Sequence, residues 1–146
     1  MNPREYVIDC DSRILGRLAS GVAKLLLEGN RVILINAEKA AVSGHPTERA
    51  ASYKRKLELV DKANPEHSPY WSRRPDMLVR RVVRGMLPYK KPKGRAAYKR
   101  LTVYVGTPHG VPAASAEKLG FKNRKETYET TITVKELSQR LGYGAR

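Results

Sequence analysis

The spacing of apolar residues predicts alternating strands and helices in the first part of the chain. Tyr6 to Cys10 predicts a short strand, and the apolar residues between positions 13 and 28 recur on one face of a helix. Arg31 to Asn36 is a continuous apolar run, which indicates a strand covered on both faces. A strand, a helix and a strand within about 30 residues predict a βαβ unit with parallel strands and a right-handed crossover.

Residues at the ends of this first helix indicate where it begins and stops. Asp11 or Ser12 is expected to cap its first turn, and Gly29 is placed to end it in the left-handed conformation. Gly16 and Gly21 lie inside the helical pattern, without the G-x-G-x-x-G or G-K-[ST] motifs of nucleotide-binding loops. Close helix packing is therefore the predicted role of both glycines.

Shorter elements are predicted in the remainder of the chain. In order, they are a short strand at 40–43, a helix at 47–62 with Tyr53, Leu57 and Val60 turned inward, an irregular loop at 63–74, a helix at 75–87, one or two helical turns at 95–100, a strand of the first sheet at 101–105, an edge strand at 128–133 and a helix at 134–141. Thr133 and Glu136 form a capping box for the last helix. No repeat or linker divides the chain, so we expect one domain over residues 1–146, in which residues 111–127 match no recognisable pattern.

The predicted helix at 75–87 is apolar on one face and basic on the other. Pro75 suits its first turn, Asp76 suits its positive end, and Pro88 stops it. The apolar face consists of Leu78, Val79, Val82, Val83, Met86 and Leu87, and the opposite face carries Arg80, Arg81 and Arg84. We expect the apolar face to pack on the protein and the arginine face to lie on phosphates.

Positive charge is concentrated in and around this helix. Residues 73–100 hold eleven Lys or Arg against one acid, a net charge of +10 out of +15 for the chain of 146 residues. The segments 1–50, 51–72 and 101–146 carry only +1, +1 and +3. A nearly neutral domain with one basic segment indicates a polyanionic partner, nucleic acid before an anionic membrane. The alternative is a solvated amphipathic helix with a basic loop, but a solvated face usually mixes both signs of charge.

The segment that follows the helix adds features suited to RNA. Tyr89 and Tyr98 flank a tail rich in Lys, Pro and Gly, and both are predicted to stack on bases. Gly85 interrupts the helical pattern, where Ala is more favourable by about 0.5–1 kcal/mol. One explanation is close approach by RNA or another backbone, and the other is fraying of the helix before Pro88.

No set of residues indicates catalysis or metal binding. The three histidines are far apart, the carboxylates are scattered, and Cys10, the only cysteine, is predicted to be a small core residue. We therefore expect no enzymatic activity, no metal and no cofactor. The chain has no apolar run long enough for a transmembrane helix and no signal-peptide h-region, so we expect a cytosolic protein.

Three segments together resemble one family. VIDCDSRILGRLASGVAKLLLEG, VILINAEKAAVSG and RRPDMLVRRVVRGMLPYKKPKGRAAYKRLTVYVG are similar to ribosomal protein L13 of the large subunit in its archaeal form, and LGRLAS and RGMLP are the most specific motifs. The resemblance implies a three-layer α/β/α fold with a mainly parallel four-stranded sheet and a basic helix-loop segment at 73–100. It also implies a cytoplasmic, structural ribosomal protein that binds large-subunit rRNA during assembly.

The same resemblance implies neighbouring large-subunit proteins as further partners. It implies no membrane, no small-molecule substrate and no obligate homo-oligomer. The predicted RNA-binding residues are Arg73, Arg74, Arg80, Arg81, Arg84, Lys90, Lys91, Lys93 and Arg95.

Two other functions stay open from the residues alone. One is a free RNA-binding regulator, which no feature of the sequence excludes. The other is an RNA-processing enzyme, which would need a titratable cluster beside the basic segment. The only acid there, Asp76, is better explained as a helix-start residue.

Overall fold

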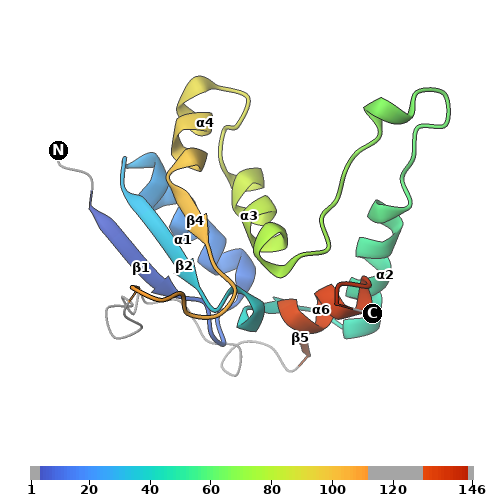
Figure 1. The fold of residues 1–146 in the computed structure, drawn as a ribbon, viewed down its shortest axis with the longest axis horizontal. Coiled ribbons are helices and arrows are strands. Elements are labelled where there is room, and N and C mark those ends of the chain that lie inside the picture. Colours follow the sequence, from blue (N-terminus) through green and yellow to red (C-terminus); the bar gives the residue numbers. More distant parts are fainter. Residues whose placement is uncertain (1–3, 112–129, 145–146) are drawn as a thin grey trace.

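A computed structural model describes residues 4–111 and 130–144 of the chain (Figure 1). Strands alternate with helices through most of these residues, as the apolar spacing predicted. In chain order the elements are β1 (Glu5–Asp9), α1 (Leu15–Leu27), β2 (Arg31–Ile35), the 3-10 helix η1 (Ala37–Lys39), β3 (Ala41–Ser43), α2 (Pro46–Leu57), the 3-10 helix η2 (Pro65–His67), α3 (Pro75–Met86), α4 (Pro92–Lys99), β4 (Leu101–Val103), β5 (Thr131–Thr133) and α6 (Val134–Arg140).

A parallel sheet with strand order β1-β2-β4 organises the described residues. Tyr6 is paired with Val32 in β2, and Val32 is paired with Leu101 in β4, in parallel register throughout. The βαβ unit and the entry of residues 101–103 into the same sheet are therefore confirmed, and the chain is an α/β protein. The strand expected at 101–105 is shorter and ends at Val103.

The parallel sheet has three strands in the described part of the chain, not the four that the family resemblance implied. The short strand β3 pairs instead with β5, antiparallel, in a second sheet. The chain turns away from the first sheet at Asn36, which has a positive φ of 53° and donates a hydrogen bond from its side chain to Asp9 Oδ1 at 3.0 Å. Because η1 follows this turn at once, β3 cannot continue beside β2.

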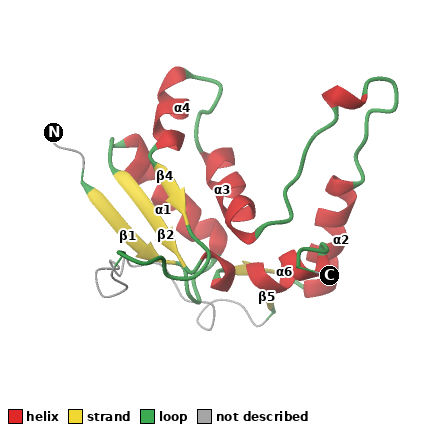
Figure 2. Cartoon of the chain, viewed as in Figure 1, coloured by secondary structure: helices red, strands yellow, loops and turns green. Residues whose placement is uncertain are grey.

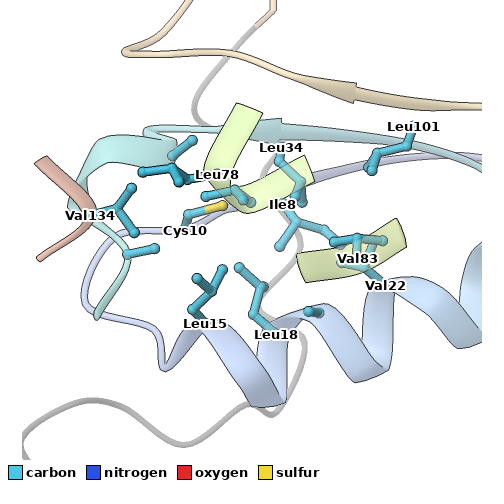
Figure 3. Packing of buried hydrophobic residues seen from close by; sticks show 14 of the residues in the cluster. Ile8, Cys10, Leu15, Leu18, Val22, Leu34, Leu78, Val83, Leu101 and Val134 are labelled. Atoms are coloured by element: carbon cyan, nitrogen blue, oxygen red, sulfur yellow. The ribbon is translucent and has the colours of Figure 1, made fainter. Parts of the chain in front are cut away.

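The main core lies on one face of the parallel sheet, between the strands and the helices α1 and α3 (Figure 3). The strands contribute Ile8, Val32, Leu34 and Leu101, which share this face because paired residues of parallel strands point to the same side. Val22 of α1 and Val83 of α3 pack into the same cluster. In the described residues, this arrangement appears as one helical layer on the sheet, with α2 and α6 beyond its end (Figure 2).

The first helix ends as predicted but begins differently. Gly29 has a positive φ of 103°, and its N–H donates to the Leu26 carbonyl, so the left-handed end is confirmed. The N-cap, however, is Ile14, with no side-chain cap. Ser12 instead hydrogen-bonds the Asp11 carboxylate and has a positive φ of 56°, so the turn places both residues before the helix start.

Two other predictions about helix packing are wrong. The helix expected at 47–62 stops at Leu57, and Val60, beyond its end, is exposed rather than turned inward. Tyr53 and Leu57 do pack against the core, as expected. Gly16 was expected in a close helix contact. A Cβ built there meets no atom within 4 Å, so Gly16 does not serve a tight contact within the described residues.

The last helix is capped as its sequence predicted. Thr133 precedes it in an extended conformation, and its Oγ1 accepts a hydrogen bond from the Glu136 N–H at 3.2 Å. Ser138 then donates a hydrogen bond from its side chain to the Arg73 carbonyl, which joins this helix to the start of α3. The last helix, α6, therefore contacts the chain where the basic segment begins, at Arg73.

The helix α4 is longer than expected and packs closely on the turn that precedes it. Its glycine, Gly94, is buried, and a Cβ built there would collide with the Pro88 carbonyl and lie 2.9 Å from the Tyr89 nitrogen. Lys91 N–H donates to the Pro88 carbonyl at 2.9 Å, which closes the turn over Gly94. The small side chain at 94 thus lets residues 88–91 fold back onto α4.

The packing of α3 predicts unequal effects of two substitutions on its apolar side. Leu78 is 4% exposed in the core, whereas Met86 is 43% exposed. Leu78→Ala should lower the free energy of unfolding by about 2–5 kcal/mol. Met86→Ala should change it by about 0.5 kcal/mol or less. Denaturant unfolding of both variants measures the difference, and equal losses would contradict the packing described for this helix.

A second pair of substitutions tests the turn on α4. Gly94→Ala should lower the free energy of unfolding by about 1–3 kcal/mol, because the Pro88 backbone must move to admit the methyl group. Gly16→Ala is the matched control, since its methyl group meets open space, and should raise stability by up to about 1 kcal/mol. Thermal melting compares the two; a Gly94→Ala variant as stable as the wild type would refute the close contact.

Candidate nucleic-acid interface

The helix α3 has the two faces that its sequence predicted, with one exception. Leu78, Val79 and Val83 are buried, and Val82 is partly buried against the core. Met86, expected on the apolar face, is exposed. The chain leaves the helix at Leu87, whose extended conformation (φ −98°, ψ 148°) turns its own side chain into the core in place of Met86.

Each of the three arginines of α3 stacks on an aromatic ring. The guanidinium carbon of Arg80 lies 4.8 Å from the ring centre of Tyr98. That of Arg81 lies 3.5 Å from the ring centre of Trp71, and that of Arg84 lies 4.1 Å from the ring centre of Tyr89. These distances are those of cation–π contacts, so the arginine side chains are held in place before any ligand arrives.

The aromatic residues therefore have a role that the sequence did not suggest. Tyr89 and Tyr98, which are predicted to stack on bases, lie edge to face, 5.4 Å apart, and each contacts an arginine. Trp71, from the loop before α3, was not predicted at all. A signal for Trp71 was present in the sequence but was not used: it is an isolated Trp two residues before the basic segment, in a loop with few other apolar residues.

Trp71 joins α3 to the second helix of the chain. Its ring lies edge to face with Tyr53 of α2, 6.3 Å away, and Lys56 lies 4.8 Å from both ring centres. Arg81 also donates from Nη1 to the Tyr70 carbonyl at 2.8 Å. The loop between α2 and α3 is thereby fastened to the basic face of α3 just where it returns to that helix (Figure 2).

The basic segment contains little negative charge to balance its arginines. In the described residues, Arg74 is the one predicted RNA-binding residue with an ion pair, at 2.9 Å from Asp76. Burial first and the neighbouring Arg84 second lower the pKa of the Arg81 guanidinium from its ordinary value. An arginine stays charged at neutral pH in any case, so this pair of like charges favours an incoming anion.

The predicted RNA-binding residues fall into three groups in the structure. Arg80, Arg81 and Arg84 form the stacked row on α3, and Arg73 and Arg74 lie at its start. The remaining four are exposed around the turn and the beginning of α4; they are Lys90, Lys91, Lys93 and Arg95. Arg100, also in the basic segment, instead donates from Nη2 to the Leu26 carbonyl at 2.8 Å and holds the end of α1.

A pocket of about 660 Å³ brings members of two of these groups together. Arg81 and Arg84 contribute from α3, and Lys90 and Lys91 contribute from the turn. Arg73, Arg74, Lys93 and Arg95 are not among its lining residues. We call this cavity the α3 pocket; its remaining lining residues are Trp71, Gly85, Leu87, Pro88 and Tyr89.

The described residues form neither a metal centre nor a membrane-spanning helix. Over residues 4–111 and 130–144, no cluster of three or more His, Cys, Asp or Glu side chains is arranged to hold a metal ion. The same residues include no helix with the length and apolar character needed to span a bilayer. Cys10 is fully buried, and burial, followed by Asp9, raises the pKa of its thiol, so it stays a protonated core residue at neutral pH.

Comparison with known proteins places these features in one family. The model of the family described as Ribosomal protein L13 matches residues 3–110. The large ribosomal subunit protein uL13 of Methanopyrus kandleri is 41% identical over 147 residues, covering 98% of this chain and 91% of that protein. The uL13 protein of Methanocaldococcus jannaschii is 44% identical, over 93% of this chain and 96% of that protein. The uL13 protein of Methanosarcina barkeri is 50% identical, over 70% of this chain and 71% of that protein. The chain therefore belongs to the ribosomal protein L13 family, as the motifs around LGRLAS and RGMLP indicated.

Proposed function

We propose that this protein is a structural constituent of the large ribosomal subunit and binds large-subunit rRNA through residues 73–100. The observation that carries the proposal is the row of three stacked arginines on α3, which have no acidic partner in the described residues. The protein works in the cytoplasm, in the ribosome, without catalysing a reaction. Residues 1–146 act as one domain that carries this basic segment.

The stacked row suits RNA that is already folded. Arginines at positions 80, 81 and 84 lie within little more than one helical turn, so they can meet phosphates that RNA folding brings close together. Each contact releases condensed cations and relieves repulsion between those phosphates. A guanidinium also donates to two phosphate oxygens at once, which favours a packed RNA junction over an isolated strand.

The surrounding basic residues extend this contact. Arg73, Lys90, Lys91, Lys93 and Arg95 add charge on both sides of the row, and Arg74 adds less because Asp76 partly neutralises it. Contacts of this kind position a protein on RNA without reading its bases. Neighbouring large-subunit proteins are further partners, and the protein acts as a single copy, not as an obligate homo-oligomer.

Co-sedimentation with the large ribosomal subunit distinguishes this proposal from a free RNA-binding regulator. After sucrose-gradient sedimentation of a lysate, the protein should migrate with the large subunit and stay there through a high-salt wash. Recovery in the light fractions, with loss from the subunit on washing, would refute the structural role. Turnover of RNA by the purified protein would favour the enzyme alternative instead.

The row of arginines predicts how salt affects RNA binding. Arg80→Ala, Arg81→Ala and Arg84→Ala should each weaken binding to large-subunit rRNA fragments and reduce the magnitude of the slope of log affinity against log salt by about one. Arg140→Ala is the matched control, because Arg140 is paired with Glu136 on α6 and should leave the slope unchanged. Salt titrations of all four variants measure this. Normal affinity and slope in all three α3 variants would rule out contact between α3 and RNA.

A further inference from the structure

The α3 pocket is an open hollow lined by residues of the basic segment and Trp71. Its volume of about 660 Å³ falls in the range of about 300–1,000 Å³ that holds small molecules. A continuous RNA duplex meets a protein mostly through its outer backbone and minor groove, and does not fill a cavity of this size. A single group that projects from the RNA can fill it.

The walls of the pocket offer flat, charged surfaces. Arg84 stacks on Tyr89 and Arg81 stacks on Trp71, and all four side chains line the pocket. Because each guanidinium already contacts a ring, its position is restricted before a ligand binds, which reduces the entropy lost on binding. Nucleic-acid bases stack on guanidinium planes as well as on aromatic rings.

Two lysines and a glycine complete the lining that the proposal uses. Lys90 and Lys91 carry ammonium groups in the same pocket as the arginine–aromatic pairs, and ammonium groups attract a phosphate linked to the base. Gly85 also lines the pocket, and a Cβ built there meets no atom within 4 Å. No contact within the described residues therefore requires glycine at this position, although Ala is more favourable in a helix by about 0.5–1 kcal/mol.

We propose that the α3 pocket receives one unpaired nucleotide of the bound RNA, with its base against the Arg84–Tyr89 pair and its phosphate beside Lys90 and Lys91. This inference rests on the proposed binding of rRNA and names the RNA feature that the site selects. Gly85 leaves room for the base. The access to the pocket that it gives offsets the lower helix propensity of glycine in α3.

Three synthetic RNA hairpins with the same stem test the proposal. The first has one bulged adenosine, the second has an abasic residue at the same bulge, and the third has no bulge. The full-length protein should bind the first about tenfold more tightly than the other two, since base stacking accounts for the difference. Trp71, the only tryptophan of the chain, lines the pocket, and its fluorescence should change more with the first hairpin than with the other two.

The glycine supplies a variant that separates the pocket from general RNA binding. Gly85→Ala should abolish the preference for the bulged adenosine, keep the affinity for the hairpin without a bulge, and leave thermal stability equal or higher. Gly16→Ala, the same change in open space on α1, should keep the preference. If the base and abasic bulges bind equally to the wild type, or if Gly85→Ala keeps the preference, the pocket does not receive a nucleotide.

The failure of the proposed function gives a different result. A protein that binds none of the three hairpins at low salt is not an RNA-binding protein of the kind proposed, and the inference fails with it. Equal binding of all three hairpins, with the salt dependence expected for α3, supports the proposed function and overturns only the nucleotide pocket.

Discussion

The basic interface depends on the burial of the apolar face of α3. Val79 and Val83 are fully buried and Leu78 nearly so, and burying such a side chain contributes about 1.5–3 kcal/mol. A cation–π contact at the surface contributes about 0.5–1 kcal/mol. The position of the helix is therefore set by its core contacts, and the aromatic rings only orient the arginines. An RNA phosphate can draw a guanidinium away from its ring without disturbing the helix that carries it.

Within the described residues, the same arrangement leaves the arginines of α3 without an acidic counterion. Burial first and the neighbouring charge of Arg84 second lower the pKa of Arg81. A guanidinium does not lose its proton at neutral pH, so deprotonation cannot relieve this repulsion. A bound anion can relieve the repulsion between the two guanidinium groups, and this relief contributes to the free energy of binding. Arg74, already paired with Asp76, contributes less by the same reasoning. The eleven basic residues of this segment are therefore expected to contribute unequally to the binding of an anion.

Local patterns predicted most of the elements and the pairing of the parallel sheet, but not the second sheet. The apolar run at Val32 to Ile35 and the caps at Gly29 and Thr133 depend on nearby residues, and all three predictions hold in the structure. The second sheet was missed because the pairing of Val42 with Ile132 joins residues far apart in the chain, and short strands carry little periodicity. The basic face was predicted from charge alone. Its supporting rings were not, because the contact of Trp71 with Arg81 depends on how a loop returns to a helix.

Two glycines in this segment show why a residue type alone did not predict its role. Gly94 sits where a methyl group would collide with the Pro88 backbone, so the fold itself requires glycine there. In the described residues, a Cβ at Gly85 meets no atom within 4 Å, so no contact there requires glycine. In the sequence, Gly94 belonged to a tail rich in Lys, Pro and Gly, and Gly85 interrupted a helix. In the structure, Gly94 allows the close turn that carries Lys90 and Lys91. Gly85 lines the pocket to which residues of this turn also contribute. A constraint from within the chain therefore explains Gly94, whereas no contact in the described residues explains Gly85, which lies in the last turn of α3.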